Sequence, residues 1–184
     1  MAQSWRVKHE RNRKVRPPLD SEGLERLALF YAGRYATTRA RLAAYLHRKL
    51  RERGWGGEGQ ANVDRLVERF VELGYINDAA FASARAASLQ RRGYGERRLD
   101  QALYAAGIEP ADAVDAKAQA QSGAWDAAVR FAERKRIGPF GGEELDRAGA
   151  QKALAAMLRA GHPMEMALKL VRARPGAVPI PDET

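Results

Sequence analysis

The sequence contains no cysteine among its 184 residues. This absence excludes a disulfide scaffold, a thiolate metal site and a cysteine nucleophile. The chain also lacks any run approaching the roughly 18 to 20 apolar residues that a membrane-spanning helix needs. Its first residues show no apolar stretch of the signal-peptide type. These absences predict a cytoplasmic protein without membrane association.

Catalytic and metal-binding arrangements are equally scarce. The three histidines are far apart in the sequence and lack the spacing of metal ligands: His9, His47 and His162. No nucleophile stands beside a base, and the acidic group at residues 143–146 is more typical of a solvated turn before a helix. The sequence therefore predicts a protein that is not an enzyme, with no catalytic residues, no metal and no cofactor.

Positive charge is in excess, with 32 Lys and Arg against 23 Asp and Glu, for a formal net charge of +9. Residues 1–16 contain six basic side chains and one acid, whereas the last ten residues contain two acids and no base. The region between these ends is therefore basic as well. Such a balance favours a polyanionic partner, either nucleic acid or anionic lipid. A basic composition that serves only solubility is the alternative.

Apolar residues between the two ends follow helical spacing. Val63, Val67 and Phe70 illustrate it, because they lie on one face of a helix at intervals of three and four residues. We find no strand-like alternation joined by hairpin turns, so the predicted fold is all-α. Residues 1–17 are predicted to be a flexible basic arm, and the proline-containing residues 175–184 a disordered tail.

A helix that ends at a glycine and is followed by a new helix occurs three times, at Gly54, Gly107 and Gly161. Apolar residues precede each glycine at intervals of four, and each unit follows a helix with basic residues at its end. Near-constant spacing of this kind indicates internal repetition. We predict three tandem three-helix repeats that form an elongated curved module, over residues 18–76, 77–121 and 122–174.

The sharpest local signal is the corner at residues 74–82. Gly74 can adopt the left-handed conformation that closes a helix, and Asn77 is a favoured residue for the cap of the next one. Asp78 would then face the positive end of that helix. Phe81 lies four residues beyond the cap, with the spacing of a hydrophobic staple. The segment predicts a tight connection between two helices.

A second glycine-containing segment, Gly93-Tyr94-Gly95, resembles part of a nucleotide-binding loop. Those loops follow a β-strand and hold a pyrophosphate at a helix N-terminus. No strand is predicted before Gly93, so we interpret the segment as a close turn, with Gly95 near the start of the next helix.

Basic side chains are spaced so that they could share one face. Arg41 and Arg48 lie seven residues apart on one helical stripe, and Arg48 points about 200° away from the apolar Leu46. Arginine suits phosphate and carboxylate groups because its planar guanidinium binds both through two hydrogen bonds. A charged outer face is also what any soluble helix needs. The candidate binding residues are Arg34, Arg41, Arg48, Arg51, Arg91, Arg92, Arg97, Arg98, Lys135 and Arg136.

Three motifs together resemble those of a known family. The first is Gly74-Tyr75-Ile76-Asn77-Asp78-x2-Phe81-Ala82, and the second is Gly93-x-Gly95-x2-Arg98-Leu99-x3-Leu103-x3-Gly107-Ile108. The third is Lys135-Arg136 followed by Leu154-x3-Leu158-x2-Gly161. Over residues 19–172 the chain resembles the RecX family, the bacterial regulators of the RecA recombinase. It departs from the family pattern at Asn77, where an acid is usual, and at His162, where an aromatic residue is usual.

The resemblance implies a non-enzymatic modulator that is mainly an inhibitor of RecA and acts in DNA repair and the SOS response. Such proteins bind in the groove or at the end of the filament that RecA forms on single-stranded DNA, and they suppress ATP hydrolysis, strand exchange and co-protease activity. The resemblance also implies that the protein acts as a monomer. From the residues alone, a general nucleic-acid-binding helical protein without a filament partner is the alternative.

Overall fold

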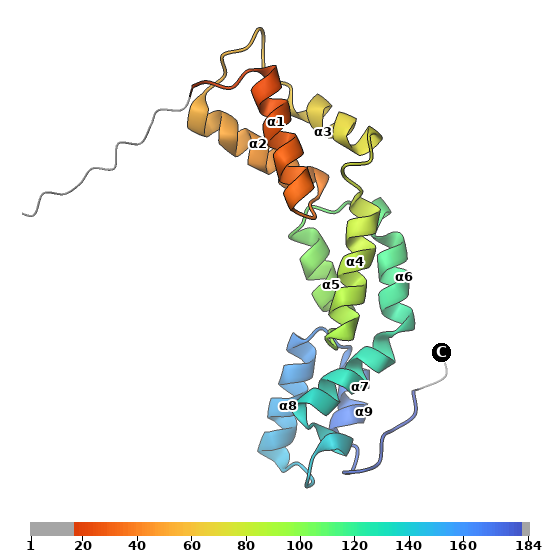
Figure 1. The fold of residues 1–184 in the computed structure, drawn as a ribbon. Coiled ribbons are helices and arrows are strands. Elements are labelled where there is room, and N and C mark those ends of the chain that lie inside the picture. Colours follow the sequence, from red (N-terminus) through yellow and green to blue (C-terminus); the bar gives the residue numbers. More distant parts are fainter. Residues whose placement is uncertain (1–16, 182–184) are drawn as a thin grey trace, which may run out of the picture.

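The computed structural model describes residues 17–181, and these form nine α-helices and two short 3-10 turns (Figure 1). The predicted all-α fold is confirmed. Most of the predicted arm, residues 1–16, and the last part of the predicted tail, residues 182–184, lie outside the described residues.

The helices follow one another as α1 (Ser21–Arg34), α2 (Arg39–Arg53), α3 (Val63–Glu72), α4 (Asp78–Arg91), α5 (Glu96–Tyr104), α6 (Val114–Ser122), α7 (Ala124–Lys135), α8 (Arg147–Arg159) and α9 (Met164–Val171). The 3-10 turns are Pro110–Ala113, directly before α6, and Gly138–Phe140, after α7.

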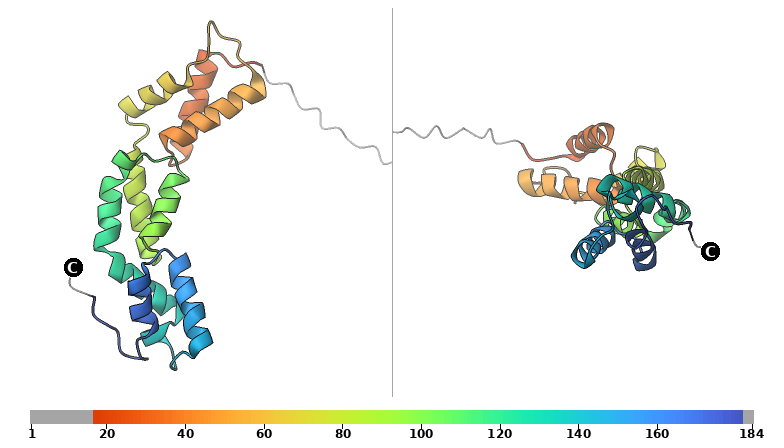
Figure 2. Two further views of the ribbon diagram at one scale, coloured as in Figure 1. Left: turned by 180° about the vertical axis from the view of Figure 1, so that it is seen from behind. Right: turned by 90° about the horizontal axis from the view of Figure 1, so that it is seen from below.

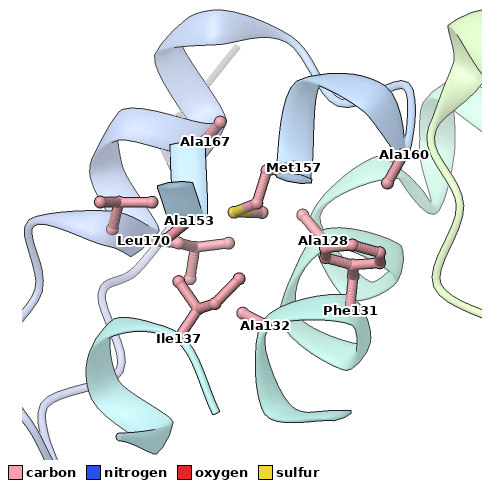
Figure 3. Packing of buried hydrophobic residues seen from close by; sticks show 10 residues of the cluster. Ala128, Phe131, Ala132, Ile137, Ala153, Met157, Ala160, Ala167 and Leu170 are labelled. Atoms are coloured by element: carbon pink, nitrogen blue, oxygen red, sulfur yellow. The ribbon is translucent and has the colours of Figure 1, made fainter. Parts of the chain in front are cut away.

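Buried apolar side chains form three separate clusters, one for each successive set of three helices. We call these sets module 1 (α1–α3), module 2 (α4–α6) and module 3 (α7–α9). In module 3 the side chain of Met157, on α8, points into the space between α7 and α9 and is fully buried (Figure 3). The helices therefore group in threes around their own cores, whereas the descent of the modules from one repeated unit stays a prediction.

The modules stand in a bowed row rather than in one bundle (Figure 1). The view from behind shows α2, α5 and α8 along the concave edge of the bow (Figure 2). The middle helix of each module therefore follows the same edge, and the shape is the elongated, curved one expected from the sequence.

These middle helices meet end to end. Thr38, the N-cap of α2, donates its hydroxyl hydrogen bond to the carbonyl of Ala106, just beyond α5, at 2.6 Å. Gly95, the N-cap of α5, donates its backbone N–H to the carbonyl of Ala160, at the end of α8, at 2.9 Å. The positive end of one helix dipole thus faces the negative end of the next, which is the favourable orientation.

The repeated glycines belong to these junctions. Gly107 and Gly161 have φ angles of +69° and +95°, in the left-handed region. A Cβ atom on Gly107 would lie 2.3 Å from that of Ala40, and one on Gly161 would lie 2.5 Å from the backbone nitrogen of Arg98. Each glycine therefore closes its helix and leaves room for the first turn of the middle helix of the preceding module.

Gly54, the first glycine of the series, does not pack against another module within residues 17–181. Its φ is +78°, and no atom lies within 4 Å of a Cβ built on it. The chain entering α1 takes that place, because Leu19 donates its N–H to the carbonyl of Gly54 at 2.9 Å. The open end of the row is thus covered by the segment that joins α1 to the N-terminal residues.

The corner at residues 74–82 has the predicted helix end and the predicted helix cap. Gly74 has a φ of +74°, and the side chain of Asn77 accepts a hydrogen bond from the N–H of Ala80 at 2.8 Å. The C-terminal segment beyond residue 174 begins in contact with module 3, because Gly176 donates its N–H to the carbonyl of Pro139 at 2.9 Å.

Candidate functional site

A pocket opens at each junction between modules. The junction 1 pocket, between modules 1 and 2, has a volume of about 680 Å³, and the junction 2 pocket, between modules 2 and 3, about 700 Å³. Within residues 17–181, no Asp or Glu lines either pocket. The basic and aromatic lining of the first is Arg34, Arg41, Arg85, Tyr35, Tyr75 and Phe81, and that of the second is Arg97, Arg98, Lys135, Arg159, Tyr94 and Phe131.

Junction 1 is held by a charged network. Arg39, at the start of α2, donates its backbone N–H to Asp78 Oδ1 at 3.0 Å and its Nε–H to Asp78 Oδ2 at 3.2 Å. Its Nη2 also donates to Asp112. Asp78 is buried, and its hydrogen bond to Arg39 raises the pKa of that guanidinium further above its usual range. Asp78, the first residue of α4, therefore binds Arg39 in the first turn of α2.

The arginines of the junction 1 pocket lie against aromatic rings. The guanidinium of Arg41 is 5.2 Å from the ring centre of Phe81. That of Arg34 is 5.9 Å from both the Phe30 and the Tyr35 rings. Cation–π contact positions a guanidinium over a ring while its N–H groups stay in the guanidinium plane. Both arginines can thus be pre-positioned and still donate to an anion.

Module 1 continues this surface with a run of tyrosines, Tyr35, Tyr31 and Tyr45, which we call the tyrosine strip. Tyr31 stacks on Tyr45 with ring centres 4.3 Å apart and lies 5.4 Å from Tyr35. Beyond Tyr45, the guanidinium of Arg48 is 5.5 Å from the ring. The strip links the exposed side of α2 to the rim of the junction 1 pocket.

Junction 2 is held by close backbone packing and one buried histidine. A Cβ atom on Gly93 would lie 2.8 Å from the backbone nitrogen of Phe131. The histidine is His162, which is fully buried. Its Nε2 lies 3.2 Å from the carbonyl of Gly93, in the preceding module.

Burial lowers the pKa of His162 to about 4, although the hydrogen bond to Gly93 opposes this shift. The ring is therefore neutral at pH 7. Because a carbonyl can only accept, the proton resides on Nε2. His162 thus joins modules 2 and 3 in its uncharged form.

The junction 2 pocket contains a tyrosine, Tyr94, that lies beside two guanidinium groups. The guanidinium groups of Arg92 and Arg134 lie 5.2 and 5.7 Å from the ring centre of Tyr94. Arg134 also donates a hydrogen bond to the carbonyl of Arg92. The second aromatic residue of this pocket, Phe131, is buried. Junction 2 therefore offers cations, but no open aromatic face.

The candidate residues divide as follows. The junction 1 pocket is lined by Arg34 and Arg41. The junction 2 pocket is lined by Arg97, Arg98 and Lys135. Two lie beside tyrosines, Arg48 and Arg92. The remaining three are exposed but line neither pocket: Arg51, Arg91 and Arg136. The structure thus brings half of the set to the two junctions.

Sequence reasoning missed several arginines of the junctions. Arg85 lies four residues after Phe81, so helical spacing alone would have placed it on the same face. Arg39 was missed because its partner Asp78 is 39 residues away in the sequence. Arg159, at the end of α8, completes the junction 2 pocket.

In the part of the chain that the structure describes, no three His, Asp or Glu side chains gather where they could hold a metal ion. No helix of residues 17–181 combines the length and the apolar character needed to cross a membrane. The fold and the pockets define an all-helical, multi-module scaffold that presents basic side chains at its joints.

Comparison with known proteins gives this scaffold a family. The model of the second three-helix domain of RecX matches residues 77–116. The chain is 36% identical to Regulatory protein RecX of Myxococcus xanthus, over 90% of this chain and 91% of that protein. It is 29% identical to Regulatory protein RecX of Mycobacteroides abscessus, over 86% and 76% of the two chains. The chain belongs to the RecX family of regulatory proteins.

A solved structure agrees with the fold. The crystal structure of RecX from Lactobacillus salivarius superposes with a TM-score of 0.65, covering 82% of this chain and 93% of that one at 18% sequence identity. At this identity the likeness concerns the fold alone.

Proposed function

We propose that this protein is a non-enzymatic modulator, mainly an inhibitor, of the RecA recombinase in the cytoplasm. It binds in the groove or at the end of the filament that RecA forms on single-stranded DNA, and suppresses ATP hydrolysis, strand exchange and co-protease activity. Membership of a family of regulatory proteins supports this role.

The observation that carries the proposal is the pair of basic pockets at successive joints of one bowed row. A helical filament presents the same chemical groups at regular intervals, and a row of modules can meet them with similar sites at regular intervals. Arginine recognises both carboxylates on protein and phosphates of DNA. The same side chains therefore suit a surface made of both components.

Titration of the protein into a RecA ATPase assay on single-stranded DNA tests this proposal. We expect inhibition by the wild type and clearly weaker inhibition by Arg41→Glu/Arg98→Glu, which reverses one charge in each pocket. Both positions lie in the first turn of a helix, where a carboxylate is favourable, so the helical content should persist. Circular dichroism checks this point.

Arg147→Glu/Arg172→Glu is the matched control. It makes the same change in net charge at exposed positions outside both pockets, and it should inhibit like the wild type. Equal inhibition by the pocket variant would reject these residues as the binding surface. No effect of the wild type on its cognate RecA would reject the proposal and favour a general nucleic-acid-binding protein. Inhibition at far less than one molecule per RecA monomer would indicate binding at filament ends.

A further inference from the structure

Two tyrosines at the rim of the junction 1 pocket are half exposed. The relative exposure of Tyr35 is 50% and that of Tyr75 is 53%. Each ring packs against a second aromatic ring. Tyr35 is tilted against Tyr31 with ring centres 5.4 Å apart, and Tyr75 is tilted against Phe70 with ring centres 5.3 Å apart. Among the described residues no cation–π contact involves Tyr75, whereas the guanidinium of Arg34 lies 5.9 Å from the ring centre of Tyr35. A supported, half-exposed ring is suited to stacking.

The cations around these rings are available to an anion. Among the ion pairs of residues 17–181, none involves Arg34, Arg41 or Arg85. The nearby Arg39 is engaged with Asp78 and Asp112 and therefore serves the junction itself. The pocket thus combines three arginines with two half-exposed aromatic rings.

We propose that the junction 1 pocket and the tyrosine strip form a binding site for single-stranded DNA. Bases of the strand stack on Tyr35 and Tyr75, while Arg34, Arg41 and Arg85 bind its phosphates. The strand must be unpaired because the faces of paired bases are stacked within a duplex. Base stacking on aromatic side chains together with a basic groove is how proteins bind single strands without reading sequence.

The junction 2 pocket does not share this role. Both of its aromatic rings are covered, Tyr94 by two guanidinium groups and Phe131 by the module 3 core. It can attract a phosphate or a carboxylate, but it has no open ring for a base. An acidic protein segment would suit junction 2, but it would make no use of the half-exposed tyrosines of junction 1.

This assignment rests on the proposed function for its DNA partner, and it assigns the DNA contact to one end of the row. The test compares binding of the full chain to a fluorescently labelled dT oligonucleotide and to a labelled abasic strand of equal length. The two probes carry the same phosphates, so charge alone binds them equally. We expect the wild type to prefer the dT strand by about fivefold or more, since one stacked base contributes at least that much.

Substitutions separate the rings from the charges. Tyr35→Leu/Tyr75→Leu should bind dT and abasic strands equally, with an unchanged salt dependence. Arg41→Gln should keep the preference for dT, while its log–log salt slope falls by about 0.7 for one lost phosphate contact. Tyr104→Leu changes a tyrosine that is 88% exposed on module 2 and should behave like the wild type. Thermal unfolding checks that each variant folds.

Equal binding of the two strands by the wild type would overturn the site, as would a dT preference that survives the double leucine substitution. The RecA ATPase assay, run in parallel, separates this failure from failure of the proposed function. Inhibition of RecA without any base preference rejects the stacking site and leaves the regulator. A base preference without inhibition supports the stacking site and rejects the regulator.

Discussion

The two junctions of this protein share one backbone geometry but are held by different side-chain interactions. In both, the start of one middle helix meets the end of another beside a glycine in the left-handed region. Junction 1 adds a network of Arg39 with Asp78 and Asp112, whereas junction 2 adds the buried, neutral His162. Close backbone packing beside a glycine is therefore common to both junctions. The effect of charge substitutions and of pH on stability should differ between them.

The largest expected effect concerns backbone fit, and a matched pair of glycines isolates it. Gly161→Ala should lower the free energy of unfolding by about 3 kcal/mol, because it combines a strained left-handed alanine with overlap against the backbone of Arg98. Gly54→Ala shares the backbone strain but meets open space, so about 1 kcal/mol is expected. Urea unfolding measures both, and equal losses would show that the junction does not require the glycine.

The pH response of junction 2 follows from the pKa of His162, which is about 4 in the folded protein against 6.5 for the ordinary side chain. Between these values the unfolded chain binds more protons than the folded one, so stability falls as the pH is lowered from about 6.5 toward 4. The loss from this group reaches about 3 kcal/mol below that window.

Urea unfolding of the wild type and of His162→Phe at pH 7 and at pH 4.5 checks this response. Phenylalanine keeps an aromatic ring in place but cannot be protonated, so its stability should change less between the two pH values. His47→Gln alters an exposed histidine and should leave the wild-type response intact. An identical pH response in His162→Phe would refute the role of this group.

The charged network of junction 1 should give a smaller effect. Asp78→Asn keeps the shape of the side chain but removes its charge, leaving Arg39 with Asp112 alone. Because the guanidinium is partly exposed, we expect a loss of about 1 to 2 kcal/mol rather than the value for a fully buried pair. Asp126→Asn changes an exposed acid in the first turn of α7 and should cost a few tenths of a kcal/mol. Similar losses of stability in both variants would show that Asp78 contributes only through its interaction with the helix dipole.

Local rules predicted much of this architecture. Apolar spacing predicted helices throughout, and the corner at Gly74 and Asn77 followed from capping preferences that act within a few residues. The near-constant interval between Gly107 and Gly161 was visible in the sequence, but its cause was not. That cause is a contact with the preceding module, and only the folded chain brings the two together.

The candidate surface was less predictable because it depends on contacts between modules. The sequence offered Arg41 and Arg98 as candidate binding residues, and the structure adds that each lines a junction pocket. It could not show that the ring of Tyr75 is half exposed while that of Tyr94 lies against two guanidinium groups, because Arg92 follows α4 and Arg134 lies on α7. Side-chain surroundings of this kind are decided by the packing of elements distant in sequence.

The most direct test of the account compares the affinity of the wild-type protein for two targets at one salt concentration: the RecA filament on single-stranded DNA, and the same DNA without RecA. A surface that meets protein carboxylates and DNA phosphates together predicts much tighter binding to the filament. Equal affinity for the two targets would contradict the account, because the naked strand would then supply all of the binding energy.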